Sequence, residues 1–180
     1  MSAPSLWPET VRLAEAARHS RREPLRRHLV ADEPVRRAIA KALDLERLDS
    51  LSADLKLCGW FDGVAIEGRF EARVVQICGV SLEPFESALV GEFSVHAVPP
   101  GSPHAPAPDA EVVVDLDAED PPDVLEGDAV DLGAYVVEHL ALEIDPFPRK
   151  PGVEFTPPEP EPESSPFAVL KGLKDRGPPE

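Results

Sequence analysis

Apolar and polar side chains alternate most regularly over residues 51–74. This period of two predicts two strands, each with one buried face. The apolar positions are Leu51, Ala53, Leu55 and Leu57 in the first run, and Ile66, Gly68, Phe70, Ala72 and Val74 in the second. The turn dipeptide Asp62-Gly63 lies between the runs and predicts a β-hairpin.

A turn at Asp62-Gly63 also predicts the register of this hairpin. Phe61 would oppose Val64, Leu57 would oppose Gly68, and Leu55 would oppose Phe70. The apolar positions of both strands then share one face, and a slip by one residue would destroy this agreement.

Further strands are expected beyond the hairpin. Residues 88–98 alternate in the same way and predict a third strand, reached through a connection at 78–86. Short links between sequential strands favour an antiparallel meander. Residues 111–116 read as a fourth strand, and residues 117–128 as an acidic loop.

Two helices are predicted from apolar stripes with a period near 3.6. The first follows the N-cap Asp32, and its stripe is Val35, Ala38, Ile39, Ala42 and Leu43. The second runs from Leu132 to about Glu143, is capped by Asp131 and is stopped by Pro146 and Pro148. Residues 11–17 fit either a short strand or the start of a helix.

Prolines divide the chain, since five of the 22 lie before residue 99 and the others follow it. Residues 156–165 form a Pro/Glu linker, and residues 166–174 form a short apolar helix that docks on this domain or on a partner. We therefore predict an α+β fold, an antiparallel β-meander or small barrel-like sheet with two main helices and a Pro-rich C-terminal extension. The expected organisation is an N-terminal basic arm (1–31), the α+β domain (32–155), the linker (156–165) and an apolar tail motif (166–180).

Charge is segregated although the net charge is −16. Residues 109–131 hold ten acidic residues and no basic one. Residues 18–41 hold eight basic residues against three acidic ones, and these are candidate RNA phosphate contacts: Arg18, Arg21, Arg22, Arg26, Arg27, Arg36, Arg37 and Lys41. Both segments are also compatible with ordinary solvated surface. The basic segment has no interleaved aromatic residue and so gives no sign of base stacking.

No motif for catalysis is present, including the nucleophile elbow, the zinc-protease helix, the P-loop and the dinucleotide glycine pattern. We expect no enzyme activity and no cofactor. Cys58 and Cys78 lack nearby paired histidines, so no zinc site is expected. Without a signal peptide or a membrane-length apolar run, we expect a cytoplasmic protein with free thiols and no membrane contact.

Three ordered stretches resemble the YceD family, the large ribosomal RNA subunit accumulation proteins, in its alphaproteobacterial form. They are residues 75–85 (VQICGVSLEPF), residues 131–138 continuing to DPFP at 145–148, and PFAVL at 166–170. The positions that carry the motifs are Cys78, Leu82, Glu83, Pro84, Phe85, Asp131, Leu132, Glu138, Pro166, Phe167 and Leu170. Many relatives have a Cys-x-x-Cys pair in the first motif. Here Ser81 replaces the second cysteine, so no metal site carries over.

The resemblance implies a non-catalytic ribosome-biogenesis factor that supports accumulation or processing of large-subunit (23S) ribosomal RNA. Its expected partner is that RNA or a pre-ribosomal particle, contacted through the basic segment. The alternative is an acidic binding protein or chaperone for a basic, possibly ribosomal, protein, contacted through residues 109–131.

Overall fold

The computed structural model describes residues 5–106 and 120–155. The chain divides into two units, Met1–Lys150 and Pro151–Glu180, and the second contributes only residues 151–155 to the described part. The linker and the apolar tail motif predicted for 156–180, and the strand predicted for 111–116, lie outside the described residues.

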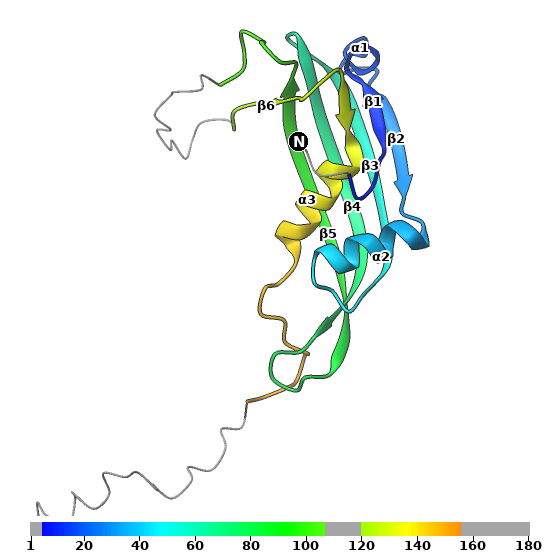
Figure 1. Cartoon of the computed structure of the whole chain (residues 1–180), viewed down its shortest axis with the longest axis vertical. Coiled ribbons are helices and arrows are strands. Elements are labelled where there is room, and N and C mark those ends of the chain that lie inside the picture. The colour runs from blue at the N-terminus through cyan, green and yellow to red at the C-terminus, as the bar shows by residue number, and fades with distance from the viewer. Residues whose placement is uncertain (1–4, 107–119, 156–180) are drawn as a thin grey trace, which may run out of the picture. The chain divides into compact units, whose positions relative to one another are not determined.

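A five-stranded sheet dominates the first unit, in the order β2-β3-β4-β5-β6 (Figure 1). Its strands are β2 (Leu25–Val30), β3 (Arg47–Trp60), β4 (Gly63–Ile77), β5 (Pro84–Val98) and β6 (Asp123–Val124). All pairs are antiparallel except β5–β6, which is parallel. The predicted α+β fold with an antiparallel meander is confirmed, with β3, β4 and β5 as its three long strands.

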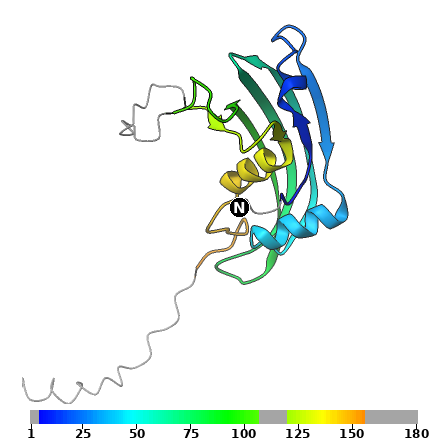
Figure 2. The ribbon, with the colours of Figure 1, turned by 45° about the horizontal axis from the view of Figure 1, so that its top comes forward.

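Helices and a small second sheet cover one face of the large sheet (Figure 2). The covering elements are β1 (Thr10–Arg12), α1 (Leu13–Ala16), α2 (Glu33–Ala42), β7 (Ala129–Asp131) and α3 (Leu132–Glu143), with β1 and β7 paired. The core therefore forms between the inner face of the sheet and residues such as Ile39 of α2 and Leu140 of α3, both fully buried. The other face of the sheet carries exposed charged side chains.

The two predicted main helices are α2 and α3. The carboxylate of Asp32 accepts from the backbone N–H of Val35 at 3.0 Å, and that of Asp131 accepts from Ala134 at 3.0 Å. Both are N-caps that satisfy an amide of the first turn. The sequence of residues 11–17 fits either a short strand or the start of a helix. The structure contains both, because β1 leads directly into the four-residue α1.

The predicted hairpin register is wrong by two residues, although the apolar faces agree. Leu57 pairs with Ile66 and Leu55 with Gly68, and the turn is Phe61-Asp62 rather than Asp62-Gly63. Gly63 is needed in the strand instead, because a Cβ there would lie 2.1 Å from the carbonyl oxygen of Ala97. A shift of two residues moves no side chain to the opposite face, which is why the pattern could not detect it.

Two cross-strand glycine–phenylalanine pairs set the register of β4 against β5. Gly68 pairs with Phe93, and Phe70 pairs with Gly91. A Cβ at Gly68 would lie 2.3 Å from the Phe93 ring, and one at Gly91 would lie 2.4 Å from the Phe70 ring. Each glycine thus leaves the space that the opposing ring fills in the core.

Three boundaries differ from the prediction. The third strand begins at Pro84, so the predicted connection 78–86 is shorter. The predicted acidic loop 117–128 contains the short strand β6. Residues 25–30, placed in the N-terminal arm by the sequence, form the edge strand β2. The alternation of β2 was hidden because Arg27 occupies an inward-facing position between Leu25 and Leu29.

Candidate nucleic-acid interface

The fold separates the eight candidate phosphate-binding residues into three groups. Arg18, Arg21 and Arg22 lie in the loop between α1 and β2, Arg26 and Arg27 lie on β2, and Arg36, Arg37 and Lys41 lie on α2. Figure 1 shows α1 and α2 toward opposite ends of the large sheet. The basic segment of the sequence therefore does not form one continuous patch.

Three of these arginines have partners within the protein. Arg27 Nη2 donates to Glu15 Oε1 of α1 at 2.8 Å, and Arg36 Nη1 donates to the carbonyl of Ala31 at 2.7 Å. Arg37 pairs with Glu33 one helical turn away at 3.5 Å. Arg27 and Arg36 therefore attach β2 and α2 to their neighbours, which gives both a structural role.

The arginines of the loop between α1 and β2 are different. The side chains of Arg18, Arg21 and Arg22 are exposed, and among the described residues none forms an ion pair. We call this segment, residues 18–22, the basic loop. Its carbonyl at His19 accepts from the backbone N–H of Gly59 at 2.8 Å, which holds the loop against the end of β3.

Four aromatic rings gather where β3 turns into β4, directly after Gly59. Trp60 stacks on His96 with centroids 4.3 Å apart and planes 17° apart. Phe61 stacks on His104 at 4.1 Å and 19°, and Trp60 meets Phe61 edge-to-face at 4.6 Å. We call these four residues the aromatic cluster.

Sequence reasoning missed this cluster. Trp60 ends β3, Phe61 belongs to the hairpin turn, His96 lies on β5, and His104 lies in the following loop. These residues lie far from the basic loop in the sequence. The lack of aromatic residues within the basic segment therefore did not exclude aromatic rings at the same end of the fold. The only sequence signal was two adjacent aromatic residues next to a predicted exposed turn.

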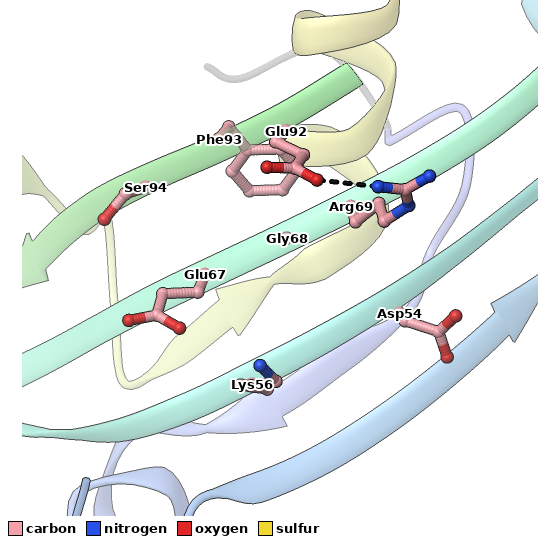
Figure 3. A pocket seen from close by; sticks show the side chains of 8 residues that line it. All are labelled: Asp54, Lys56, Glu67, Gly68, Arg69, Glu92, Phe93 and Ser94. Atoms are coloured by element: carbon pink, nitrogen blue, oxygen red, sulfur yellow. Dashed lines mark hydrogen bonds and ion pairs between the residues drawn. The ribbon is translucent and has the colours of Figure 1, made fainter. Parts of the chain in front are cut away.

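The open face of the sheet carries compensated charge rather than a basic patch (Figure 3). Four residues form one row of cross-strand partners on β2, β3, β4 and β5: His28, Asp54, Arg69 and Glu92. Arg69 Nη1 donates to Glu92 Oε1 at 2.7 Å, and His28 Nδ1 lies 2.8 Å from Asp54 Oδ1. Such cross-strand pairs are the ordinary arrangement of a solvent-facing sheet. Arg26 belongs to this face, beside Lys56.

A cleft of about 550 Å³ opens between the edge of β5, α3 and residues 120–123. Arg21 and His96 line it together with Asp123, Tyr135 and Glu138. The hydroxyl of Tyr135 donates to Asp123 Oδ2 at 3.0 Å. Burial, and then the nearby carboxylate of Asp123, raise the pKa of Tyr135 above its ordinary value, so the phenol stays protonated.

His139 also borders this cleft but is held in place by structural contacts. Its ring stacks on Phe93 with centroids 4.1 Å apart, and its Nδ1 lies 2.8 Å from the carbonyl oxygen of Tyr135. Acidic side chains also border this part of α3, with Asp120 and Glu138 in this cleft beside Arg21 and Glu126 in the adjoining one.

The first motif forms a tight turn around a buried thiol. Cys78 Sγ accepts from the backbone N–H groups of Val80, Ser81 and Lys150 at 3.3–3.4 Å. Hydrogen bonds from Ser81, first of all, and from Lys150 lower the pKa of Cys78 to about 6. The turn joins the DPFP stretch, since Gly79 N–H donates to the carbonyl of Pro148 at 2.9 Å.

The other motif residues divide between structural and surface positions. Lys150 Nζ donates to Glu83 Oε2 at 2.8 Å, and this bond lowers the pKa of Glu83. Pro84 and Phe85 begin β5, Leu132 is buried in the core, and Glu138 lines the cleft. Leu82 is 76% exposed and has a φ of 58°. Pro166, Phe167 and Leu170 lie outside the described residues.

Both cysteines are free thiols in buried positions. Within 5–106 and 120–155, no three histidine, cysteine or acidic side chains gather in a way that could hold a metal ion. Of the helices in the described part of the chain, none combines the length and apolarity needed to cross a membrane.

Comparison with known proteins identifies one family. The model of the family described as large ribosomal RNA subunit accumulation protein YceD matches residues 66–174, which is more than half of the chain. The match includes the first and second motifs and reaches the apolar tail motif. No curated protein and no solved structure matches the chain significantly.

Proposed function

Because the chain belongs to the YceD family of large ribosomal RNA subunit accumulation proteins, we propose that it supports 23S ribosomal RNA by binding RNA directly. Family membership gives it a role in ribosome biogenesis. The 23S specificity, the direct contact with RNA, the absence of catalysis and a cytoplasmic location are parts of the proposal.

The observation that carries the proposal is the basic loop. Arg18, Arg21 and Arg22 are exposed and have no acidic partner among the described residues, whereas Arg27, Arg36 and Arg37 do have intramolecular partners. A guanidinium group fits a phosphate through paired N–H donors and stays charged at any physiological pH. The basic loop therefore has the chemistry of an RNA backbone contact.

The phenol in the cleft beside α3 is not poised as a general base. Burial of Tyr135 and the nearby carboxylate of Asp123 raise its pKa, so the phenol stays protonated. The proposal therefore assigns no proton-abstracting role to this tyrosine.

RNA recovery after crosslinking in cells tests the proposal. The variant Arg21→Glu/Arg22→Glu should recover much less large-subunit RNA than the wild type. The matched control Arg37→Glu/Lys41→Glu changes the charge equally on α2, which lies toward the other end of the sheet, and should retain most of the recovery. Equal recovery from the wild type and the basic-loop variant would remove the proposed contact.

A second candidate is binding of a basic ribosomal protein. It is favoured by the acidic surface around α3, where Asp120, Asp123, Glu126 and Glu138 border two adjacent clefts. Replacing Asp120, Asp123 and Glu126 by the matching amides should then abolish co-purification of a basic protein. If this happened while the basic-loop variant still recovered RNA normally, the second candidate would replace the first.

A further inference from the structure

The aromatic cluster lies at the tip of the hairpin, outside the hydrophobic core. Phe61 is 71% exposed, which leaves most of its ring in contact with solvent. One side of the ring is covered by His104, and the edge contact with Trp60 supports it from β3. The ring is thus held by its neighbours but remains open on its outer side.

Phe61 is also an unfavourable residue for its backbone position. Its φ is 49°, in the left-handed region where glycine and asparagine are preferred and a bulky side chain is unusual. An aromatic residue here therefore has two costs, backbone strain and an exposed apolar ring. Such local costs are typical of binding sites, where the strained residue serves the ligand rather than the fold.

The cluster and the basic loop lie at the same end of the sheet. The backbone N–H of Gly59 donates to the carbonyl of His19 in the basic loop, and Gly59 immediately precedes Trp60. His96 stacks on Trp60 and also lines the same cleft as Arg21. The exposed ring of Phe61 and the cationic side chains of the basic loop therefore belong to the same end of the sheet.

We propose that an unpaired nucleobase stacks on Phe61, supported by Trp60, while the basic loop contacts the flanking phosphates. The inference deepens the proposed function and rests on it, since it names the class of RNA recognised: a single-stranded segment such as a loop or bulge. Proteins recognise unpaired RNA by stacking its bases on aromatic rings, whereas paired bases are not available for stacking on a protein ring. An apolar protein partner would use the same rings without needing the adjacent arginines.

Tryptophan fluorescence provides a direct readout of the complex. The chain has two tryptophans, and Trp7 is 2% exposed in the core, so a change on adding RNA reports Trp60. The probe is a short single-stranded oligoadenylate, compared with its duplex with oligouridylate at equal salt. The full-length wild type should bind the single strand with quenching and bind the duplex more weakly.

Variants at Phe61 distinguish stacking from charge. Phe61→Gly removes the ring and suits the positive φ, so folding is preserved, and the affinity for the single strand should fall about tenfold. Phe61→Tyr should keep nearly wild-type affinity. The matched control Phe147→Ala removes another exposed phenylalanine, 80% exposed, that follows α3, and should leave the affinity unchanged.

The outcomes separate the two proposals. If Arg21→Glu/Arg22→Glu loses RNA while Phe61→Gly binds like the wild type, the stacking site is wrong and the proposed function stands. Equal affinity of the wild type for single strand and duplex also overturns the stacking site. A wild type that binds neither probe overturns direct RNA binding itself.

Discussion

The backbone N–H of Gly59 donates a 2.8 Å hydrogen bond to the carbonyl oxygen of His19. This bond connects two segments that lie far apart in the sequence, the basic loop and the end of β3. It brings the basic loop to the end of β3, one residue before Trp60 and two before the exposed Phe61. The proposed RNA surface therefore depends on a backbone contact that neither segment reveals alone.

Substitution of Gly59 should displace the basic loop. A Cβ at this residue would lie 2.6 Å from the carbonyl oxygen of Ala17, so the loop must move away from β3. We expect Gly59→Ala to lower the free energy of unfolding by about 1–3 kcal/mol. We also expect it to weaken RNA binding by the folded protein.

Gly127→Ala is the control for this prediction, because a Cβ there would meet nothing within 4 Å. Urea unfolding and RNA titration of both variants provide the comparison. A Gly59→Ala protein with wild-type stability would contradict the described approach of the loop to β3.

The salt dependence of RNA binding should report the basic loop. The logarithm of the RNA association constant falls linearly with the logarithm of the salt concentration. For a single strand, each phosphate contact that is lost reduces the magnitude of this slope by about 0.7. We expect the slope for Arg21→Glu/Arg22→Glu to be shallower than that of the wild type by about two such contacts. Titrations at four or more salt concentrations measure it, and an unchanged slope would show that these arginines do not touch phosphate.

Arg27 should contribute to stability rather than to RNA binding. Its ion pair with Glu15 is partly exposed, with side-chain exposures of 39% and 50%, so its coupling energy should be modest. A double-mutant cycle with Arg27→Ala and Glu15→Ala should give about 0.2–1 kcal/mol. The Arg27→Ala protein should keep its affinity for RNA, and a large loss would assign Arg27 to the interface instead.

The stability of the fold should depend on pH through Cys78. Its pKa is lowered in the folded protein from the ordinary value of 9.0 to about 6, chiefly by hydrogen bonds from Ser81 and Lys150. A group with a depressed folded pKa adds stability that is fully present above its unfolded pKa and is lost as pH falls through its folded pKa. The free energy of unfolding should therefore decrease as pH falls from about 9 to about 6.

Cys78→Ala should lack this component of the pH profile while retaining contributions from the carboxylates. Denaturant unfolding of the two proteins over this range, under reducing conditions, measures the difference. Parallel profiles for the wild type and Cys78→Ala would show that the thiol does not ionise in this way.

The sequence predicted those elements whose patterns are strong and local. Both main helices were predicted because Asp32 and Asp131 cap clear apolar stripes. The inner face of the hairpin was predicted because alternation persists over many residues. The register was not, since Gly63 resembled a turn residue but is required by the close carbonyl of Ala97.

The candidate site was only partly predictable. The basic residues were visible in the sequence, but their separation by the fold was not, because β2 was hidden by the inward-facing Arg27. The aromatic cluster joins Trp60 and Phe61 to His96 and His104, which belong to other segments. Contacts of this kind depend on strand pairing, which local pattern does not encode.

The most direct test of the account is the ratio of 23S to 16S ribosomal RNA in cells whose only copy of this gene carries Arg21→Glu/Arg22→Glu. The account predicts a lower ratio than in wild-type cells, at equal protein level, with the Arg37→Glu/Lys41→Glu strain close to normal. A normal ratio in the basic-loop strain would contradict the claim that this surface supports large-subunit RNA.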